Sequence, residues 1–359
     1  MDTLEQARAE IDAVDAQLAA LFERRMAAVL SVAQYKQAHG LPIFDAAREA
    51  VVLEKAAARI RNAALRPYYK DHVQNMMDVA KQYEAEVLGR NRAAYQGVEG
   101  AFAHIALRAL FPHAEAVSCP TWDEVFDAVS RGDTAHGVVP FENSHAGDVS
   151  AVLDLCYNHP ELWVVDVYDL PISQNLLVLP GTQLAQLRHV YSHQQAIAQS
   201  ETFLKQFHLP ATAMLNTAMA AKMVAEKGDR HAAAISSHPC AALYGLTCLN
   251  DSIQDSDNNY TRFICITKDP VIYAGANRIS LIIAFDNRPG ALYEILSKLA
   301  ALDINMTKLE SCPVAGSDFE FVFFLELDAS VQDPSVLAML EEMERSCAEF
   351  QFLGNYAEV

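Results

Sequence analysis

Three basic residues interrupt the apolar face of the first predicted helix: Arg8, Arg25 and Lys36. Arg25 and Lys36 are close to three full helical turns apart, so they project from one side, about 16 Å apart along the axis. Side chains of that length could close on a small dianion. Arg8 lies about 25 Å from Arg25 along the axis and points elsewhere. It is therefore either solvated or part of a site on a second copy of the chain.

A second predicted helix begins at Asp45, where Arg48 would meet any ligand held by Arg25 and Lys36. The order and spacing of charged and apolar residues resemble the all-helical chorismate mutases along five runs: 8–11, 23–26, 35–36, 41–45 and 48–49. The resemblance implies that the matching positions bind the two carboxylates and the ether oxygen of chorismate, and that the other protomer donates Arg8. The implied substrate-binding residues are Arg8, Arg25, Lys36, Asp45, Arg48, Glu49, Ala80 and Glu84.

The rearrangement of chorismate to prephenate is pericyclic and needs a compact conformer with cations near the breaking C–O bond. Arg25 and Lys36 are therefore the predicted catalytic residues, and the alternative is a solvated charged helix face. Ala80 and Glu84 stand where the family often has Ser and Gln. Glu84 could donate to the ether oxygen only when protonated, so we expect mutase activity to fall as pH rises. Alternatively, Glu84 is simply a surface charge.

In the middle of the chain, polar residues stand where predicted strands give way to helices. Ser192 is expected to form a capping box with Gln195, and Asn216 precedes a helix together with Thr217. Gln199 lies one turn further along the first of these helices. Free backbone N–H groups at helix starts favour carboxylates. Ordinary helix capping is the alternative reading of each position.

Five motifs in this region together resemble the prephenate dehydratases: 95–102, 137–144, 191–199, 234–246 and 259–263. The last contains Thr261-Arg262-Phe263, and the resemblance implies that Thr261 is catalytic. Prephenate must lose CO2 and its ring hydroxyl, so we expect Thr261 to assist hydroxide departure. Arg262 would balance carboxylate charge or form a structural ion pair instead. The expected substrate-binding residues are Asn143, Ser192, Gln199, Thr217, Thr261, Arg262 and Phe263.

From residue 279 the pattern predicts strand, helix, strand, strand, helix and strand, the order of a ferredoxin-like unit. Residues 287–293, with Gly290 where a backbone could approach a ligand, resemble the ligand loop of ACT domains. Glu310-Ser311-Cys312-Pro313 resembles their Glu-Ser-Arg-Pro motif, with Cys312 removing a cation. The resemblance implies that L-phenylalanine is an effector, and the alternative is a dimerisation unit without ligand. The expected effector-binding residues are Gly290, Ala291, Leu292, Tyr293, Glu310 and Ser311.

Helical spacing without Gly or Pro over residues 4–35 predicts a helix of about 50 Å. A domain of 90 residues has a radius of gyration of about 12 Å, so such a helix cannot be covered by its own chain, and an intertwined dimer or higher oligomer is expected. Two more helices are predicted over 45–62 and 67–88. In the middle region, strands are predicted at 94–96, 137–141, 162–169, 174–179, 189–191, 232–235 and 262–267.

The predicted fold class is therefore multidomain. An all-α dimeric domain (residues 1–90) precedes a two-lobed α/β domain like the periplasmic binding proteins (93–270) and an α+β ferredoxin-like ACT domain (277–359). Seven dispersed cysteines indicate neither a metal site nor disulfides, and no cofactor is expected. The net charge of −19 argues against nucleic acid and anionic membranes as partners.

Without an apolar run long enough for a membrane span or a signal peptide, a cytoplasmic bifunctional enzyme of phenylalanine biosynthesis is the preferred interpretation. Chorismate and prephenate would be its substrates. Three alternatives stay open at this point: an arogenate dehydratase, a dehydratase whose helical domain serves only dimerisation, and a ligand-sensing protein without catalysis.

Overall fold

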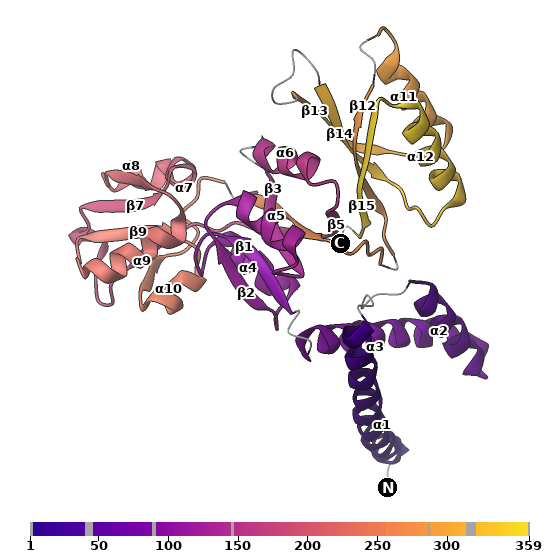
Figure 1. Ribbon diagram of the computed structural model, residues 1–359. Helices are drawn as coiled ribbons and strands as arrows, with labels where there is room; N and C mark the ends of the chain where they lie inside the picture. The colour runs from indigo at the N-terminus through magenta and orange to yellow at the C-terminus, as the bar shows by residue number, and fades with distance from the viewer. Residues whose placement is uncertain are drawn as a thin grey trace. The chain divides into compact units, whose positions relative to one another are not determined.

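The computed structural model describes residues 3–39, 46–87, 91–144, 147–256, 258–273, 275–285, 288–313 and 321–357. The chain divides into two compact units, Met1–Asn91 and Arg92–Val359 (Figure 1). Within the described residues, no helix is long and apolar enough to span a membrane.

The first unit is helical. It contains α1 (Thr3–His39), α2 (Ala46–Arg59), a short 3-10 turn η1 (Ala63–Leu65) and α3 (Arg66–Val87). The predicted long first helix is confirmed and extends to His39, whereas the second ends at Arg59 because Asn62 caps the 3-10 turn. α2 packs on α3 through Ala56, Val73 and Met77. Every residue of α1 from position 4 to 24 is exposed, so most of that helix lies outside this unit's core.

The second unit begins with an α/β lobe. Its sheet has the order β2-β1-β3-β11-β5, with β4 paired to β3. The strands are β1 (Arg92–Gln96), β2 (Glu115–Cys119), β3 (His136–Asn143), β4 (Gly147–Asp148), β5 (Trp163–Pro171) and β11 (Tyr260–Thr267). The helices are α4 (Phe102–Leu110), α5 (Trp122–Arg131) and α6 (Ser150–Asn158). β11 enters between β3 and β5 and is antiparallel to both.

A second α/β lobe is inserted between β5 and β11. Its sheet order is β10-β6-β9-β7-β8, with strands β6 (Asn175–Val178), β7 (His189–His193), β8 (Ala211–Met214), β9 (Ala232–Ser236) and β10 (Thr247–Asn250). The helical segments are η2 (Leu184–Gln186), α7 (Gln194–Gln199), α8 (Glu201–Gln206), α9 (Thr217–Lys227) and α10 (Pro239–Tyr244). Because the chain leaves the first lobe after β5 and returns as β11, the start of β11 lies next to the second lobe.

The C-terminal part of this unit is a four-stranded antiparallel sheet of order β13-β14-β12-β15. Its elements are β12 (Arg278–Ala284), α11 (Ala291–Ala301), β13 (Met306–Pro313), β14 (Phe321–Asp328), α12 (Pro334–Ser346) and β15 (Glu349–Tyr356). This is the ferredoxin-like order that the sequence predicted. Ile279, Leu281 and Ile283 face the two helices, which cover one side of the sheet.

The other side of the C-terminal sheet packs on the first lobe. Ile282, Phe324 and Leu353 share one buried cluster with Phe141 and Cys156. The rings of Phe141 and Phe324 meet edge to face, with centroids 5.1 Å apart. The two sheets are therefore joined by a common apolar core, beside the strands that carry Asn143 and Thr261.

All seven strands predicted for the two lobes are present, but four others were missed. β2, β8 and β10 are edge strands, and β4 is a two-residue pairing. The edge strands carry more exposed residues than the central β6 and β9, which are buried throughout. They therefore lack the apolar run that marks a central strand.

Candidate active sites

In the helical unit, α1 and α3 bring together four of the predicted mutase residues. Arg25 Nη1 donates to the carbonyl oxygen of Met76 at 3.2 Å, and Lys36 Nζ lies 3.4 Å from Glu84 Oε1. Met76, Ala80 and Glu84 succeed one another at four-residue intervals, so they share the face of α3 that meets α1. The two cations therefore lie on one side of α1 against this face, as their spacing predicted.

The other predicted mutase residues lie elsewhere in the described chain or beyond it. Arg8 is exposed on α1, more than four turns before Arg25, and Arg48 is exposed on α2. Asp45 and the side chain of Glu49 lie outside the described residues. Glu84 is buried rather than a surface charge, with 5 % of its surface exposed. Its ion pair with Lys36 thus occupies a shielded position.

A cavity of about 500 Å³ lies where the two α/β lobes meet. Its lining includes Asn143 of β3, Thr261 and Phe263 of β11, Gln199 of α7 and Thr217 of α9. Five of the seven residues predicted for the dehydratase site are thus brought to one place. They come from positions up to 120 residues apart in the sequence, because β11 returns beside β3 after the second lobe.

A chain of hydrogen bonds crosses from the second lobe to the first inside this cavity. Gln195 Nε2 donates to Asn143 Oδ1 at 3.0 Å, and Asn143 Nδ2 donates to Thr261 Oγ1 at 2.9 Å. The first bond fixes which end of the Asn143 amide faces Thr261. Since Thr261 Oγ1 accepts from Asn143, its own hydroxyl hydrogen is directed away from that amide, where a ligand could accept it.

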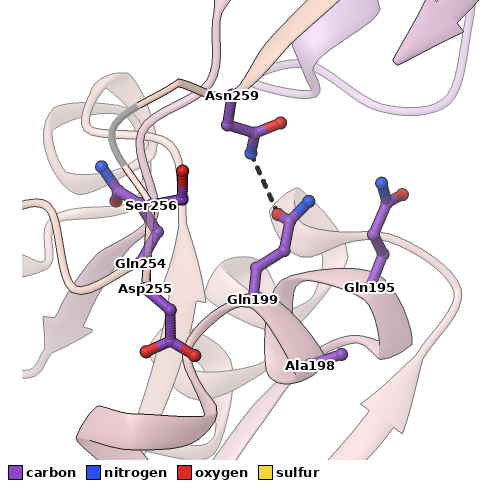
Figure 2. Close-up of a pocket in the computed structure, with 7 residues that line it drawn as sticks. All are labelled: Gln195, Ala198, Gln199, Gln254, Asp255, Ser256 and Asn259. Atoms are coloured by element: carbon purple, nitrogen blue, oxygen red, sulfur yellow. Dashed lines mark hydrogen bonds between the residues drawn. The ribbon is translucent and has the colours of Figure 1, made fainter. Parts of the chain in front are cut away.

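A second cavity of about 330 Å³ adjoins helix α7. It is lined by residues of α7 and of the segment that precedes β11 (Figure 2). Gln199 Oε1 accepts from Asn259 Nδ2 at 3.0 Å and from Gln174 Nε2 at 3.3 Å. Gln199 Nε2 is buried and has no hydrogen-bond partner in the described part of the chain. This amide nitrogen is therefore a donor available to a bound molecule.

The larger cavity carries no formal charge among its described lining residues. Its polar groups are amides, hydroxyls and the His193 imidazole, whose pKa burial lowers, so that the neutral ring is favoured. Asn216 caps α9 by accepting from the N–H of Met219 at 2.7 Å, as predicted. A ligand here meets neutral donors rather than side-chain cations.

Two predicted residues are placed differently. The prediction that Ser192 caps a helix is wrong, because β7 continues to His193, which is the N-cap instead. Ser192 is fully buried and donates to the carbonyl oxygen of Ile235 at 2.6 Å. Arg262 does not line the cavity; it binds Asp169 through Nε and Nη2 at 2.9 and 3.0 Å. That contact matches the alternative of a structural ion pair, and Asp169 raises the pKa of Arg262 further.

The predicted effector residues lie at one end of the C-terminal sheet, because β12 and β13 run in the same direction. Gly290 caps α11 with a positive φ of 89°, which a glycine adopts without strain. Ala291 is buried, Leu292 is half-buried and Tyr293 is exposed. Asn287 lies outside the described residues. Glu310 and Ser311 are successive residues of β13, so their side chains point to opposite faces.

Sequence reasoning missed several polar residues of the lobes. Gln195 had been read only as a capping partner, and Gln174, His193 and Asn259 received no role. Gln174 and Asn259 are buried, and buried amides require hydrogen-bond partners. Gln195, His193 and Asn259 lie within the motifs 191–199 and 259–263, but nothing in the sequence alone indicates that Gln174 and Asn259 are buried.

One group of described residues has ligand atoms close enough to hold a metal ion. Atoms of His238, Cys248 and Asp251 lie within 4.8 Å of one another. None of these three residues lines either cavity described above.

Two family models match this chain, one over the helical residues and one over the two α/β lobes. The family model for chorismate mutase type II matches residues 7–85, and the model for prephenate dehydratase matches residues 93–271.

Two curated relatives show the extent of the similarity. The bifunctional chorismate mutase/prephenate dehydratase of Stutzerimonas stutzeri is 31% identical, with 99% of this chain and 98% of the relative covered. Arogenate dehydratase/prephenate dehydratase 2 of Arabidopsis thaliana is 35% identical over 74% of this chain and 73% of its own length.

Two solved structures each cover about three quarters of this chain. Prephenate dehydratase from Arthrobacter aurescens in complex with L-Phe has 27% identity and a TM-score of 0.69, covering 74% of this chain and 90% of that one. GqqA, described as a novel type of quorum quenching acylase, has 30% identity and a TM-score of 0.68, covering 75% and 98%.

Proposed function

Because this chain belongs to the family of bifunctional chorismate mutase/prephenate dehydratases, we propose that each activity resides at the residues described above. The protein rearranges chorismate to prephenate, then decarboxylates and dehydrates prephenate to phenylpyruvate for phenylalanine biosynthesis. The chain of hydrogen bonds from Gln195 through Asn143 to Thr261 is the observation that carries the assignment of the dehydratase site.

In the mutase site, Arg25 and Lys36 bind the carboxylates and the ether oxygen of chorismate. Glu84 stands beside Lys36 and donates to the ether oxygen when it is protonated. A second copy of the chain supplies Arg8, because α1 exposes a row of apolar side chains that an intertwined partner would cover. These are Leu4, Ile11, Val14, Leu18, Leu21 and Phe22, all more than 40 % exposed.

In the dehydratase site, the ring carboxylate of prephenate leaves as CO2, and its bonding electrons enter the ring and expel hydroxide. The Thr261 hydroxyl donates a hydrogen bond to the departing oxygen. The released hydroxide is then protonated to water. Asn143 holds Thr261 in position, while Gln199 Nε2 and Thr217 orient the substrate.

The neutral lining of the cavity suits a decarboxylation. The reacting carboxylate loses its negative charge as the C–C bond breaks, so a side-chain cation beside it would stabilise the substrate more than the transition state. Amide donors and apolar walls avoid that stabilisation. The ion pair of Arg262 with Asp169 agrees with this scheme, because it holds the arginine next to Thr261 outside the cavity.

The experiment that tests the assignment follows chorismate loss and phenylpyruvate formation together on the purified protein. Both activities are expected. Prephenate consumption without chorismate loss would reduce the helical unit to a dimerisation domain. Absence of both would favour a ligand-sensing protein.

A competition assay between prephenate and arogenate decides which of the two is the preferred substrate. The question arises because relatives named arogenate dehydratase match about three quarters of this chain. We expect a higher kcat/KM with prephenate than with arogenate, in keeping with the full-length bifunctional relatives. An acylase activity like that named for GqqA is not favoured. Acyl transfer needs a nucleophile beside a general base, whereas Thr261 Oγ1 accepts from an amide.

L-phenylalanine is the effector that we propose for the C-terminal sheet, which we interpret as an ACT domain. Two features support the proposal: the complex with L-Phe solved for the Arthrobacter enzyme, and the positions of residues 288–293 and 310–311 at one end of the sheet. The described cysteines are all free thiols, which suits the reducing cytoplasm that we propose as the enzyme's location.

A further inference from the structure

Two pairs of charged residues face each other where the C-terminal sheet packs on the first lobe. In the lobe, Arg262 of β11 stands opposite Glu142 of β3. In the C-terminal sheet, Lys308 of β13 stands opposite Glu326 of β14. Lys308 Nζ lies 3.0 Å from Glu142 Oε2, and Arg262 Nη1 lies 3.6 Å from Glu326 Oε2. These four side chains, alternating in sign around a ring, are here named the charge quartet.

The lobe's half of the charge quartet is adjacent in sequence to the dehydratase site. Glu142 precedes Asn143, and Arg262 follows Thr261. Successive side chains of a strand point to opposite faces, so one face of the β3–β11 pair carries the cavity residues and the other carries the charges. Asn143 and Thr261 are themselves opposite each other in register. A displacement of Glu142 relative to Arg262 would therefore also displace the Asn143 amide relative to the Thr261 hydroxyl.

The charge quartet is held from both sheets. The Glu326 side chain is only 4 % exposed and accepts from the Tyr356 hydroxyl at 3.1 Å. Arg262 also makes a two-point contact with Asp169, its register partner on β5, a geometry that fixes the guanidinium plane. The Lys308 side chain is 13 % exposed and that of Glu142 is 36 % exposed, so their pair is partly shielded from solvent and salt.

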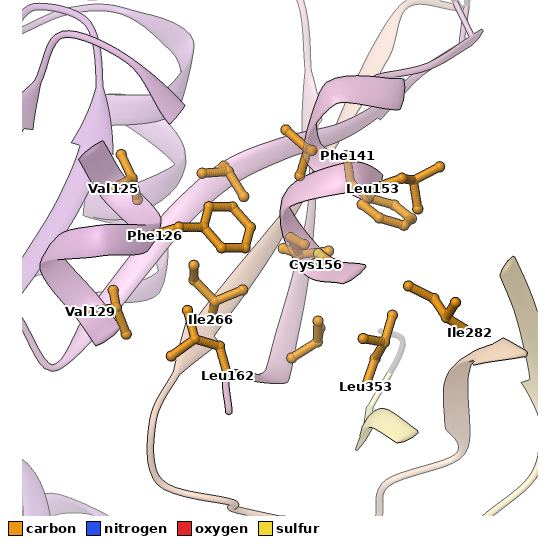
Figure 3. Packing of buried hydrophobic residues seen from close by; sticks show 14 of the residues in the cluster. Val125, Phe126, Val129, Phe141, Leu153, Cys156, Leu162, Ile266, Ile282 and Leu353 are labelled. Carbon is orange, nitrogen blue, oxygen red and sulfur yellow. The ribbon is translucent and has the colours of Figure 1, made fainter. Parts of the chain in front are cut away.

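The apolar core continues around these charges. Lys308 Nζ lies 5.1 Å from the centroid of the Phe141 ring and 5.8 Å from that of Phe324. Figure 3 shows Phe141 in the shared cluster with Ile282 and Leu353 of the C-terminal sheet. The contact between the two sheets is thus a packed core with a charged pairing beside it.

We propose that the charge quartet positions the dehydratase site: Lys308 and Glu326 hold β3 and β11 so that Asn143 meets Thr261. Lys308 does not line the cavity, so it is a positioning residue that acts through Glu142 and Asn143. The inference rests on the proposed role of Thr261. It makes the C-terminal sheet part of the machinery for dehydration even in the absence of an effector.

The test is Lys308→Met in the full chain, compared with Lys298→Met. Lys298 makes a similar but more exposed pair, Nζ to Glu342 Oε1 at 2.7 Å, between α11 and α12, away from the charge quartet. With prephenate, Lys308→Met is expected to lose about tenfold to a hundredfold in kcat with little change in KM. Lys298→Met should retain wild-type kcat, and Lys308→Arg, which keeps the charge, should recover most of it. Mutase turnover of the same samples reports whether the helical unit is intact.

Glu142→Gln, which preserves side-chain volume, gives a second test if Lys308→Met does not fold. It should lower kcat as Lys308→Met does, and the double variant should lose no more than either single one, because both remove one interaction. Equal kcat values in Lys308→Met and Lys298→Met, or fully additive losses, would overturn the proposal. Thr261→Ala distinguishes the charge quartet from the proposed role of Thr261. Normal dehydratase turnover in Thr261→Ala would refute the role of Thr261. Lost turnover in Thr261→Ala together with normal turnover in Lys308→Met would refute only the charge quartet.

Discussion

A threonine hydroxyl carries one hydrogen and can accept two hydrogen bonds, and the proposed dehydratase site would use these capacities separately. Thr261 Oγ1 accepts from Asn143 Nδ2, which leaves its hydrogen for the substrate. The orientation of Asn143 is itself fixed by Gln195. One donor is thus aimed by two amides, so no charged group is needed next to the departing hydroxide.

We expect Thr261→Ala to lower the kcat for prephenate by about 10²- to 10⁴-fold, the usual contribution of a positioned proton donor. Phenylpyruvate formation measures it. Thr261→Ser retains the hydroxyl and should preserve most of the activity, and chorismate loss should be unchanged in both variants. Near-normal dehydration by Thr261→Ala would refute the assignment.

Glu84 is a buried carboxyl 3.4 Å from Lys36, at the position where the proposed mutase site calls for a donor to the ether oxygen of chorismate. An amide supplies such a donor, whereas a carboxylate only accepts. Glu84→Gln should therefore retain at least the wild-type kcat/KM for chorismate, measured as chorismate loss. A large fall would show that Glu84 acts instead through its ion pair with Lys36.

At the scale of elements, strand periodicity explains both the dehydratase site and the errors of prediction. Thr261 and Arg262 are neighbours in one motif, yet they serve opposite faces of β11, one toward the cavity and one toward Glu326. Ser192 fell inside a strand because β7 runs two residues beyond its predicted end. A shift of two residues along a strand changes a helix cap into a buried hydrogen bond within the sheet.

The contact between β15 and β5 depends on one glycine. A Cβ added at Gly354 would collide with the carbonyl oxygen of Val164, a backbone atom that cannot move aside alone. Gly354→Ala should therefore destabilise the packing of the C-terminal sheet on the first lobe by about 1 to 3 kcal/mol. Thermal unfolding of the full chain measures the loss. An unchanged melting temperature would mean that the two strands separate without cost.

At the scale of the whole molecule, α1 leaves a long stretch of its surface uncovered by its own unit. Its residues from position 4 to 24 are all exposed, and Arg8 lies too far along the helix to meet a ligand held by Arg25. If Arg8 serves a second copy, as proposed, a single chain would offer two partial mutase sites rather than one complete site. An intertwined dimer would bury the apolar row of α1 and complete both sites at once.

Mixing two inactive variants tests this arrangement. Arg8→Ala and Arg25→Ala should each lose mutase activity, and subunit exchange should restore about a quarter of it, because half of the randomly mixed dimers contain one intact site. Dehydratase turnover should remain normal throughout and so serves as the control. If mixing restores nothing although exchange is shown by size or mass, Arg8 acts within its own chain.

The sequence by itself determined the features that depend on local spacing. Helical periodicity predicted α1, alternation predicted the central strands, and the residues around Arg25 and Thr261 indicated the two activities. These properties need only near neighbours along the chain, so they can be read before the chain is folded.

The tertiary structure alone decided which distant residues meet. The return of β11 beside β3 brings Asn143 to Thr261, and the packing of two sheets sets Lys308 against Glu142. Edge strands such as β2 could not be predicted from the sequence, because they are strands through their pairing with a neighbour rather than through their composition. Such contacts depend on register and burial, which are set by the whole fold and not by any local pattern.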